Sequence, residues 1–328
     1  GNHFEEFRDI DYLPDTGSKR VLTTGGHFGY LKIAEGCDKH CTYCIIPKLR
    51  GKFRSVPMER LIAQAEDMAE QGVKELILVA QETTVYGKDL YGKKSLHILL
   101  KKLCEIRGIR WIRILYCYPE EIYDELIETI RDEKKICHYL DIPIQHASDR
   151  ILKRMGRRTS KQELIDIVGK LRKEIPDIVL RTTLITGFPG ETEEDHEELK
   201  EFVDEMEFDR LGVFTYSPEE NTPAAEMADQ VPEEVKEERR DELMELQQEI
   251  SYDRGQDRIG QELLVMIEGK VADESAYIGR TYGDAPKVDG YIFVQTGELL
   301  MTGDFAKVRV TGALEYDLIG VLSDEYTE

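Results

Sequence analysis

Short runs of apolar residues alternate with amphipathic segments from about residue 28 to residue 216. The amphipathic segments repeat their apolar residues at helical spacing, whereas the short runs have the length and composition of buried strands. Strands separated by helices indicate βαβ units and a parallel sheet, and six units predict an α/β fold, a partial (β/α)6 barrel open on one side. The predicted strands are Tyr30–Ala34, Leu76–Ala80, Trp111–Tyr116, Tyr139–Ile144, Val179–Ile185 and Leu211–Tyr216.

Two of the predicted helices carry start signals. Ser160 and Glu163 have the spacing of a capping box, in which the two residues satisfy each other's backbone N–H groups. Thr192 is expected to cap the next helix. Apolar residues gather on one face behind each cap: Leu164, Ile167, Val168 and Leu171 in the first helix, and Leu199, Phe202, Val203 and Met206 in the second.

The pattern changes twice after the barrel. Residues 232–254 are highly charged and predict a connecting helix that packs on the barrel, which itself spans 28–231. Residues 255–323 contain short apolar runs between glycine-rich turns and predict a small all-β antiparallel barrel of OB-like size. Its predicted strands are Leu263–Glu268, Ala276–Arg280, Tyr291–Gln295, Phe305–Val310 and Asp317–Val321.

Cys37, Cys41 and Cys44 form a C-x3-C-x2-C motif directly after the first predicted strand, where such barrels place their chemistry. Three thiolates can bind three irons of a [4Fe–4S] cube and leave the fourth iron open. An open iron can cleave S-adenosylmethionine (SAM) reductively. Zinc is an alternative but usually needs a fourth Cys or His at suitable spacing, and His40 lies inside the x3 loop. Three structural thiols are a further alternative.

With Tyr43 before its last cysteine, the motif resembles the radical-SAM superfamily. Three runs around it, Ile33–Cys37, Tyr43–Pro47 and Arg50–Ser55, resemble the methylthiotransferases, which add a methylthio group to a tRNA base or a ribosomal protein. The resemblance covers about 28–321 and implies that the small barrel is a TRAM domain.

Residues 1–27 show neither helical nor strand periodicity. They are interpreted as a linker from an N-terminal domain that this chain is expected to lack. The resemblance implies that this domain ligates a second [4Fe–4S] cluster through three cysteines and delivers sulfur. Because no cysteine precedes Cys37, the chain is expected to cleave SAM but not to complete methylthiolation.

The resemblance also suggests SAM contacts on loops that follow the predicted strands. Gln81 and Glu82 follow the second strand, where the SAM amino group or the substrate is expected. Glu82 departs from the expected Asp but keeps the carboxylate. Gln145 and His146 follow the fourth strand as cavity candidates, although a histidine that only supports neighbouring groups is an equal alternative for His146.

Two further candidates involve the fifth strand. The turn after it contains Gly187, Gly190 and Glu191. Glycines at a strand-to-helix turn let a ligand approach the backbone, and this turn resembles the SAM-contacting glycine loop; a plain helix entry is the alternative. Arg181 is a charge within an apolar strand and needs a partner, for which the SAM carboxylate is one choice.

Composition narrows the setting. The chain is 34% charged and has neither a run of 18 apolar residues nor a signal segment, which predicts a cytoplasmic protein that does not enter membranes. Clustered cysteines suit a reducing compartment. Cys104, Cys117 and Cys137 share no spacing and are predicted to be buried small hydrophobes.

The net charge of −22 opposes a nucleic-acid binder, because affinity for phosphates comes from cationic groups. The densest basic patch consists of Lys153, Arg154, Arg157 and Arg158. It is interpreted either as a solvated helix end or as a contact with SAM or the substrate.

Two methylthiotransferase subfamilies compete, one acting on tRNA adenosine and one on the β-carbon of an aspartate of ribosomal protein S-twelve. The runs 80–87, 116–119, 144–149 and 283–290 resemble the second. Residues 255–328 hold 6 Lys and Arg against 14 Asp and Glu, and an acidic TRAM domain suits a basic ribosomal protein rather than stable tRNA binding. An electron donor such as flavodoxin or ferredoxin is expected. A non-enzymatic Fe–S protein is the remaining alternative, although a carrier would normally close its cluster with a fourth cysteine.

Overall fold

The computed structural model describes residues 25–272 and 274–327, so residues 1–24 of the predicted linker lie outside the described residues. Six parallel strands form one open, curved sheet in the order β1-β4-β5-β6-β7-β8. This arrangement confirms the predicted partial barrel. The strands are β1 (Phe28–Lys32), β4 (Glu75–Val79), β5 (Trp111–Ile114), β6 (Ile136–Gln145), β7 (Val179–Thr186) and β8 (Arg210–Thr215).

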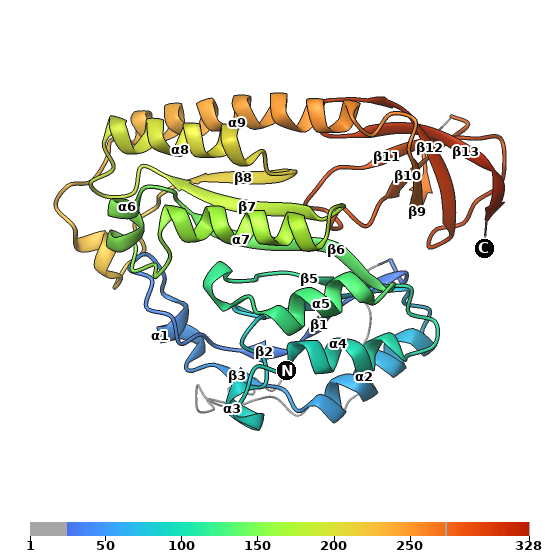
Figure 1. The fold of residues 1–328 in the computed structure, drawn as a ribbon, viewed down its shortest axis with the longest axis horizontal. Helices are drawn as coiled ribbons and strands as arrows, with labels where there is room; N and C mark the ends of the chain where they lie inside the picture. The colour runs from blue at the N-terminus through green and yellow to red at the C-terminus, as the bar shows by residue number, and fades with distance from the viewer. Residues whose placement is uncertain (1–24, 273, 328) are drawn as a thin grey trace, which may run out of the picture.

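Helices cover the outer face of this sheet (Figure 1). The capping box predicted at Ser160 is present at the start of α7, and Thr192 forms a second one with Asp195 at the start of α8. The helices of this layer are α2 (Met58–Glu70), α4 (Leu96–Cys104), α5 (Asp124–Asp132), α7 (Lys161–Glu174) and α8 (Glu193–Met206).

Short elements that the periodicity did not predict lie in the loops after the strands. A two-stranded antiparallel sheet joins β2 (Ala34–Glu35) to β3 (Arg54–Ser55) across the cysteine motif. The short helices are α1 (Ile46–Arg50), α3 (Lys88–Tyr91) and α6 (Asp149–Arg154), with 3-10 turns at Pro119–Glu121 and Pro223–Glu226.

The charged segment after the barrel is the long helix α9 (Glu233–Gln256), which packs against α8 and β8. It leads into five strands that close into a barrel in the order β10-β11-β13-β12-β9. An odd number of strands cannot alternate in direction all the way around a closed barrel. Accordingly β11 and β13 pair in parallel and the other four pairs are antiparallel. The strands are β9 (Glu262–Lys270), β10 (Ala276–Arg280), β11 (Ile292–Gln295), β12 (Phe305–Ala313) and β13 (Leu318–Thr327).

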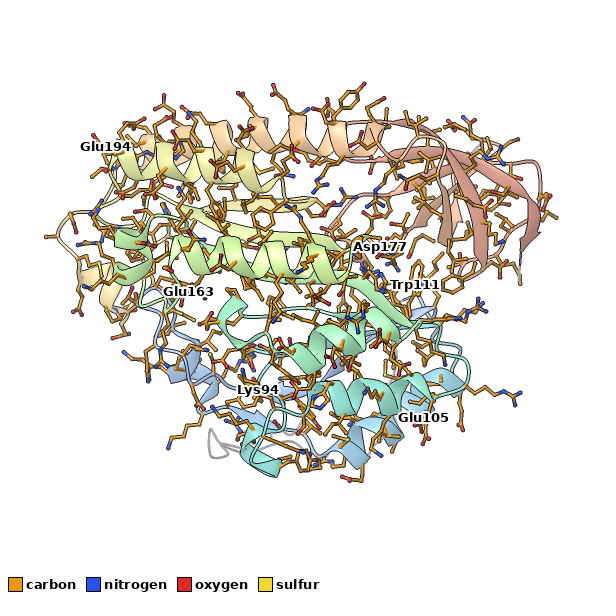
Figure 2. All side chains as sticks on the ribbon, in the orientation of Figure 1. Lys94, Glu105, Trp111, Glu163, Asp177 and Glu194 are labelled. Atoms are coloured by element: carbon orange, nitrogen blue, oxygen red, sulfur yellow. The ribbon has the colours of Figure 1, made fainter. Side chains whose placement is uncertain are left out.

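The small barrel docks at the N-terminal ends of the parallel strands, opposite α1 and α6 (Figure 1). Trp111, the first residue of β5, is labelled in Figure 2. Its ring packs edge-on against Phe305 of β12 with ring centroids 4.9 Å apart. Asp284 of the small barrel pairs with Arg210 at 2.5 Å. The loops that follow the parallel strands therefore lie at the end of the barrel away from the small domain.

A buried group of charges completes this domain contact. The carboxylate of Glu75 lies between Arg113 of the same sheet (2.7 Å) and Arg280 of the small barrel (2.6 Å). All three side chains are fully buried. Both cations lower the pKa of the Glu75 carboxyl, even though burial by itself would raise it. Each member of the triad therefore depends on the others to remain charged away from water.

Candidate functional site

The cysteine loop is held in place by its backbone. The N–H of Cys37 donates to the carbonyl of Gly51 (3.1 Å), and the N–H of Thr42 donates to the carbonyl of Met155 (2.9 Å). The Asp38 carboxylate accepts the N–H of Phe53 at 3.0 Å. The loop is therefore fixed between the β2–β3 sheet and the end of α6.

The three thiols of this loop fit an iron–sulfur cluster. All three are free; Cys37 and Cys41 are buried and Cys44 is half-buried. Burial raises the pKa of Cys37 to about 11, and the nearby sulfurs of Cys41 and Cys44 add to the effect. Sulfurs that oppose one another's ionisation share one neighbourhood, and cationic iron would relieve that opposition.

The same three thiols do not form a compact single-ion site. Among residues 25–272 and 274–327, no three His, Cys, Asp or Glu side chains are grouped to hold one metal ion. Tetrahedral zinc requires such a group, whereas a cube binds each thiolate on a different iron.

Gln81 and Glu82 follow β4 and lie beside this loop, but they do different things. The Gln81 amide accepts the N–H of Gly36 (2.8 Å) and donates to Glu35 (3.2 Å), so it supports the cysteine loop. The Glu82 carboxylate is buried, and its Oε1 accepts the N–H of Thr84 at 3.0 Å. Its Oε2 is buried with no partner in the described part of the chain. Burial raises the pKa of Glu82 to about 7.

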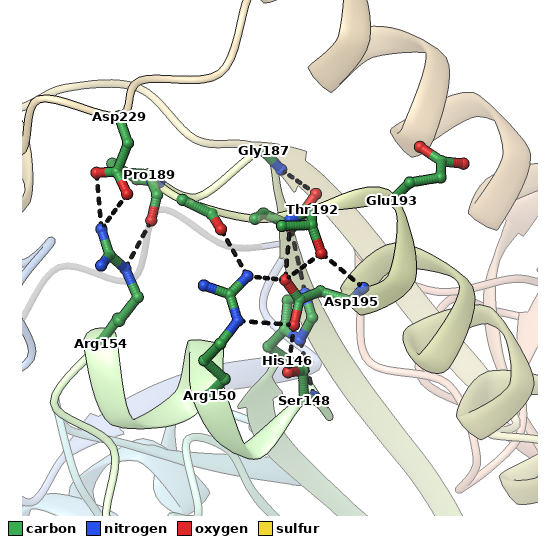
Figure 3. A network of polar contacts seen from close by, with 12 residues as sticks. His146, Ser148, Arg150, Arg154, Gly187, Pro189, Thr192, Glu193, Asp195 and Asp229 are labelled. Carbon is green, nitrogen blue, oxygen red and sulfur yellow. Dashed lines mark hydrogen bonds and ion pairs between the residues drawn. The ribbon is translucent and has the colours of Figure 1, made fainter.

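A network of polar contacts fastens the turn after β7 to α6 (Figure 3). Arg154 donates to the carbonyl of Pro189 (3.0 Å) and pairs with Asp229 (2.7 Å). Arg150 donates to the carbonyl of Gly190 (2.6 Å) and also pairs with Asp195. Side-chain contacts from α6 therefore hold this turn in place.

Glu191 is the internal anchor of this turn. Its buried carboxylate accepts the N–H of Gly187 (3.0 Å) and pairs with His146 (3.2 Å) and Arg239 (2.8 Å). Burial would raise the pKa of Glu191, but these donors, led by His146, lower it. With both oxygens taken up by the protein, Glu191 is placed to shape the turn rather than to contact SAM directly.

Gly187 and Gly190 have positive φ angles of 67° and 82°, which explains the choice of glycine. The space beside each of them is filled by the protein itself. A Cβ at Gly187 would strike the side chain of Lys236, and one at Gly190 would lie 2.9 Å from the guanidinium of Arg154. The two glycines are thus explained by the backbone conformation of the turn and by close packing within the protein.

Gln145 and His146 are adjacent in sequence but have different surroundings in the structure. The Nδ1 atom of His146 accepts the N–H of Ser148 at 3.0 Å, so its Nε2 carries the proton toward Glu191. His146 is fully buried and holds the turn after β7. Gln145 has a strained φ of 73° at the end of β6, and its amide has no hydrogen-bond partner within the described residues. Strain of this kind at a strand end is typical of ligand sites.

Arg181 does have the charged partners that its position requires, but they belong to the protein. It contacts Asp141 of β6 (3.0 Å) and Asp289 of the small barrel (3.3 Å). Asp289 in turn accepts the hydroxyl of Tyr139 at 2.7 Å. These two carboxylates satisfy the need of Arg181 for a charged partner, and its contact with the SAM carboxylate stays a prediction.

Several residues at the site were not singled out from the sequence. Tyr118 lies with its hydroxyl 3.8 Å from the sulfur of Cys41. Phe188 packs against Tyr43 and Tyr216 with ring centroids 6.4 and 5.4 Å away. Arg239 reaches the site from α9. The sequence offered one signal for Arg239. Lys236 and Arg239 are charged residues on the buried side of α9, the helix that was interpreted as a connector.

The other cysteines behave as predicted for small hydrophobes. Cys117 and Cys137 are buried and Cys104 is half-buried. Burial raises the pKa of all three thiols, to about 12 for Cys104 and Cys137. They lie on separate elements, so within the described residues they do not form a second cysteine triplet.

Comparison with known proteins agrees with this site. The model of the radical SAM superfamily matches residues 31–203, and that of the TRAM domain matches residues 259–322. Coproporphyrinogen III oxidase from Escherichia coli, a radical SAM enzyme, superposes with a TM-score of 0.54 at 16% identity, covering 86% of this chain and 66% of that one. The methyltransferase TsrM from Kitasatospora setae gives a TM-score of 0.51 at 16% identity, covering 60% of this chain and 38% of its own. These two likenesses show the fold, and the fold with its matched model defines a radical SAM enzyme.

Relatives in sequence are much more similar. A ribosomal protein uS12 methylthiotransferase RimO from Lachnoclostridium phytofermentans is 67% identical over 98% of this chain and 73% of its own length. A protein of the same name from Clostridium botulinum is 53% identical over 94% of this chain and 69% of its own. The chain belongs to the uS12 methylthiotransferase family, which is a family of transferases. Its cofactors are a [4Fe–4S] cluster and SAM, and the family carries a second cluster.

Proposed function

We propose that this chain is the part of a methylthiotransferase that uses SAM to modify the β-carbon of an aspartate of ribosomal protein uS12. The observation that carries this proposal is the 67% identity to a uS12 methylthiotransferase over nearly the whole chain. When bound, the cluster and SAM supply a one-electron cleavage that activates an unreactive C–H bond. The protein's task is to hold, orient and shield these groups.

The contacts support the following roles for individual residues. Cys37, Cys41 and Cys44 bind three irons and leave the fourth for SAM. Glu82 takes the SAM amino group, because its buried Oε2 lacks a partner among the described residues. Gln145 contacts SAM or the substrate through its unpaired amide. Gln81, His146 and Glu191 act indirectly by fixing the loops.

The role of Glu82 predicts a pH dependence of SAM binding. Its pKa is raised to about 7, so the carboxyl is mostly neutral at pH 6 and mostly ionised at pH 8. A cationic amino group binds the ionised form, so SAM affinity should rise about tenfold between pH 6 and pH 8 and level off above the pKa. Calorimetry on the anaerobic, cluster-loaded protein measures this. The E82Q variant should bind more weakly and lose the rise; a rise that persists in E82Q would assign it to another group.

We also propose that the small barrel provides a docking surface for uS12 and that a flavodoxin or ferredoxin supplies the electron. The small barrel is acidic, and ribosomal proteins are basic. It lies at the end of the larger barrel opposite the cysteine loop (Figure 1). Docking there would therefore hold the partner without covering the site. Among the described residues no helix is long and apolar enough to cross a membrane.

The experiment compares binding of the anaerobically reconstituted protein to purified uS12 and to unmodified tRNA across a salt series. Exchanging the exposed Glu262, Glu274, Glu298 and Glu315 for Gln should abolish saturable uS12 binding. A matched control exchanges the same number of exposed glutamates on the larger domain: Glu66, Glu70, Glu125 and Glu128. The control should bind like the wild type.

Two results would change the assignment. Preferential tRNA binding with a steep salt dependence would favour the tRNA-modifying subfamily. Absence of both SAM binding and 5′-deoxyadenosine formation would favour an Fe–S carrier. We further propose that this chain cleaves SAM but does not complete methylthiolation. Sulfur transfer requires ligands for a second cluster, and residues 25–272 and 274–327 contain no second triplet of cysteines.

A further inference from the structure

Arg157 is a buried cation that the roles assigned above leave unused. It was predicted as part of a basic patch with Lys153, Arg154 and Arg158, but the structure divides that patch. Arg154 is paired with Asp229, and Lys153 and Arg158 are exposed. Arg157 alone is buried, with only 6% of its surface exposed.

The guanidinium of Arg157 is incompletely satisfied by the protein. Its Nη2 donates to the carbonyl of Pro143 at 2.7 Å. Its Nε and Nη1 atoms are buried and have no hydrogen-bond partner in the described part of the chain. Leaving donors of a charged group unpaired away from water is costly, so they are expected to serve a group that binds there.

The position of Arg157 identifies that group. Its guanidinium lies 4.3 Å from the ring centroid of Tyr118, and the hydroxyl of Tyr118 lies 3.8 Å from the sulfur of Cys41. The chain just before Arg157 is bonded to the cysteine loop, because Thr42 contacts the carbonyls of Met155 and Arg154 at 2.9 and 2.8 Å. The cation is therefore fixed directly behind the cysteine motif.

Among the described residues no carboxylate forms an ion pair with Arg157, although Glu120 acts on it from a distance. Glu120 and Glu121 are bound to Lys39, at 3.4 and 2.6 Å. Glu82 is bonded to Thr84. Arg157 thus remains a cation without an ion-pair partner among the described residues, and it faces the place where three thiolates would gather around the cluster.

We propose that Arg157 is a positioning residue that sets the reduction potential of the cluster held by Cys37, Cys41 and Cys44. This proposal rests on the proposed function of these three cysteines. Reduction adds one negative charge to an already anionic centre. A buried cation with free N–H donors stabilises that charge, since cluster potentials depend on net charge and on hydrogen bonds to sulfur. Arg157 therefore favours uptake of the electron that SAM cleavage requires.

The test measures the midpoint potential of the loaded cluster by a redox titration without SAM, in which EPR detects the reduced cluster. In R157Q the equilibrium constant for reduction of the cluster should fall at least tenfold. For one electron this corresponds to a midpoint potential about 59 mV more negative. R157K keeps the charge and should shift less than half as far. R158Q removes the same charge from the exposed neighbouring position and should leave the potential unchanged.

Each alternative outcome overturns the proposal. An unchanged potential in R157Q would mean that Arg157 only packs against the loop. An equal shift in R158Q would assign the effect to overall charge. A shift that appears only after SAM is added would place the donors on SAM instead of the cluster. Should R157Q fail to load the cluster, R157K decides: loading at the wild-type potential supports the charge role, and failure to load or a tenfold shift refutes it.

This measurement is independent of the transfer reaction. It uses neither uS12 nor tRNA, so a wrong substrate assignment would leave the potential shift intact. Conversely, if the R157Q variant modifies uS12 and its cluster has the wild-type potential, only the proposed role of Arg157 is disproved.

Discussion

Replacing Cys41 by alanine should abolish cluster binding and reduce SAM cleavage to background. Cys41 is buried on the loop that Thr42 and Cys37 fix in place, and it is one of three thiols for three irons. A cube in C41A would keep only the thiolates of Cys37 and Cys44. The loop has no fourth cysteine that could replace Cys41. Iron content, the visible spectrum and 5′-deoxyadenosine formation measure the effect.

The control for this variant is C104A. Cys104 ends α4, on the outer helical layer of the barrel, and its half-buried thiol packs against the apolar core. In the cluster-free protein, both variants remove one sulfur and should lower the free energy of unfolding by only about 1 kcal/mol. C104A should retain cluster and activity. A C41A protein that still holds a full complement of iron would show that the ligands are elsewhere.

Replacing Arg280 by methionine should lower the free energy of unfolding by about 3 kcal/mol, because the buried carboxylate of Glu75 loses one of its two cationic donors. Arg280 joins Glu75 of the large barrel at 2.6 Å and Glu268 at 2.5 Å. Its loss leaves Glu75 with Arg113 as its remaining cationic partner in the triad. Since the triad crosses the domain contact, the small barrel should also separate in an earlier transition. Denaturant unfolding followed by tryptophan fluorescence reports on this contact, because the single Trp111 packs against Phe305.

The matched control is K307M, in the same small barrel. Lys307 pairs with Glu262 at 3.7 Å, and both side chains are nearly half exposed. Exposed pairs of this kind contribute at most about 1 kcal/mol, so K307M should unfold like the wild type. A loss in R280M that is no larger than in K307M would mean that the domain contact is held by its apolar packing alone.

The two sets of predictions concern opposite ends of the larger barrel. The cysteine loop, Glu82 and Arg157 lie at the C-terminal ends of the parallel strands, whereas Arg280, Asp284 and Asp289 contact their N-terminal ends. The run 283–290, which suggested the uS12 subfamily, therefore packs into the domain contact. A motif that marks a subfamily can thus reflect how the domains dock rather than how the substrate is recognised.

The sequence by itself determined the elements, the order of the domains and the position of the cysteine motif. Helices and strands follow from local periodicity, and capping boxes such as that of Ser160 involve residues only three positions apart. The three cysteines are likewise close in sequence, so their spacing alone indicates a shared cofactor. For the same reason the site loops were correctly expected after the strands, because chain direction fixes that end of a parallel sheet.

Only the tertiary structure decided the partners of the buried charges. Glu75 and Arg280 are 205 residues apart and Glu191 and Arg239 are 48 apart, and no local pattern links such pairs. Arg181 could be predicted to need a carboxylate, but its partners proved to be Asp141 of β6 and Asp289 of the docked small barrel. Arg157 and Arg158 are adjacent and identical in the sequence, yet one is buried beside Cys41 and the other faces solvent. Whether a charged side chain is buried changes its energy far more than which charged residue it is. Burial in turn is set by the packing of the whole chain.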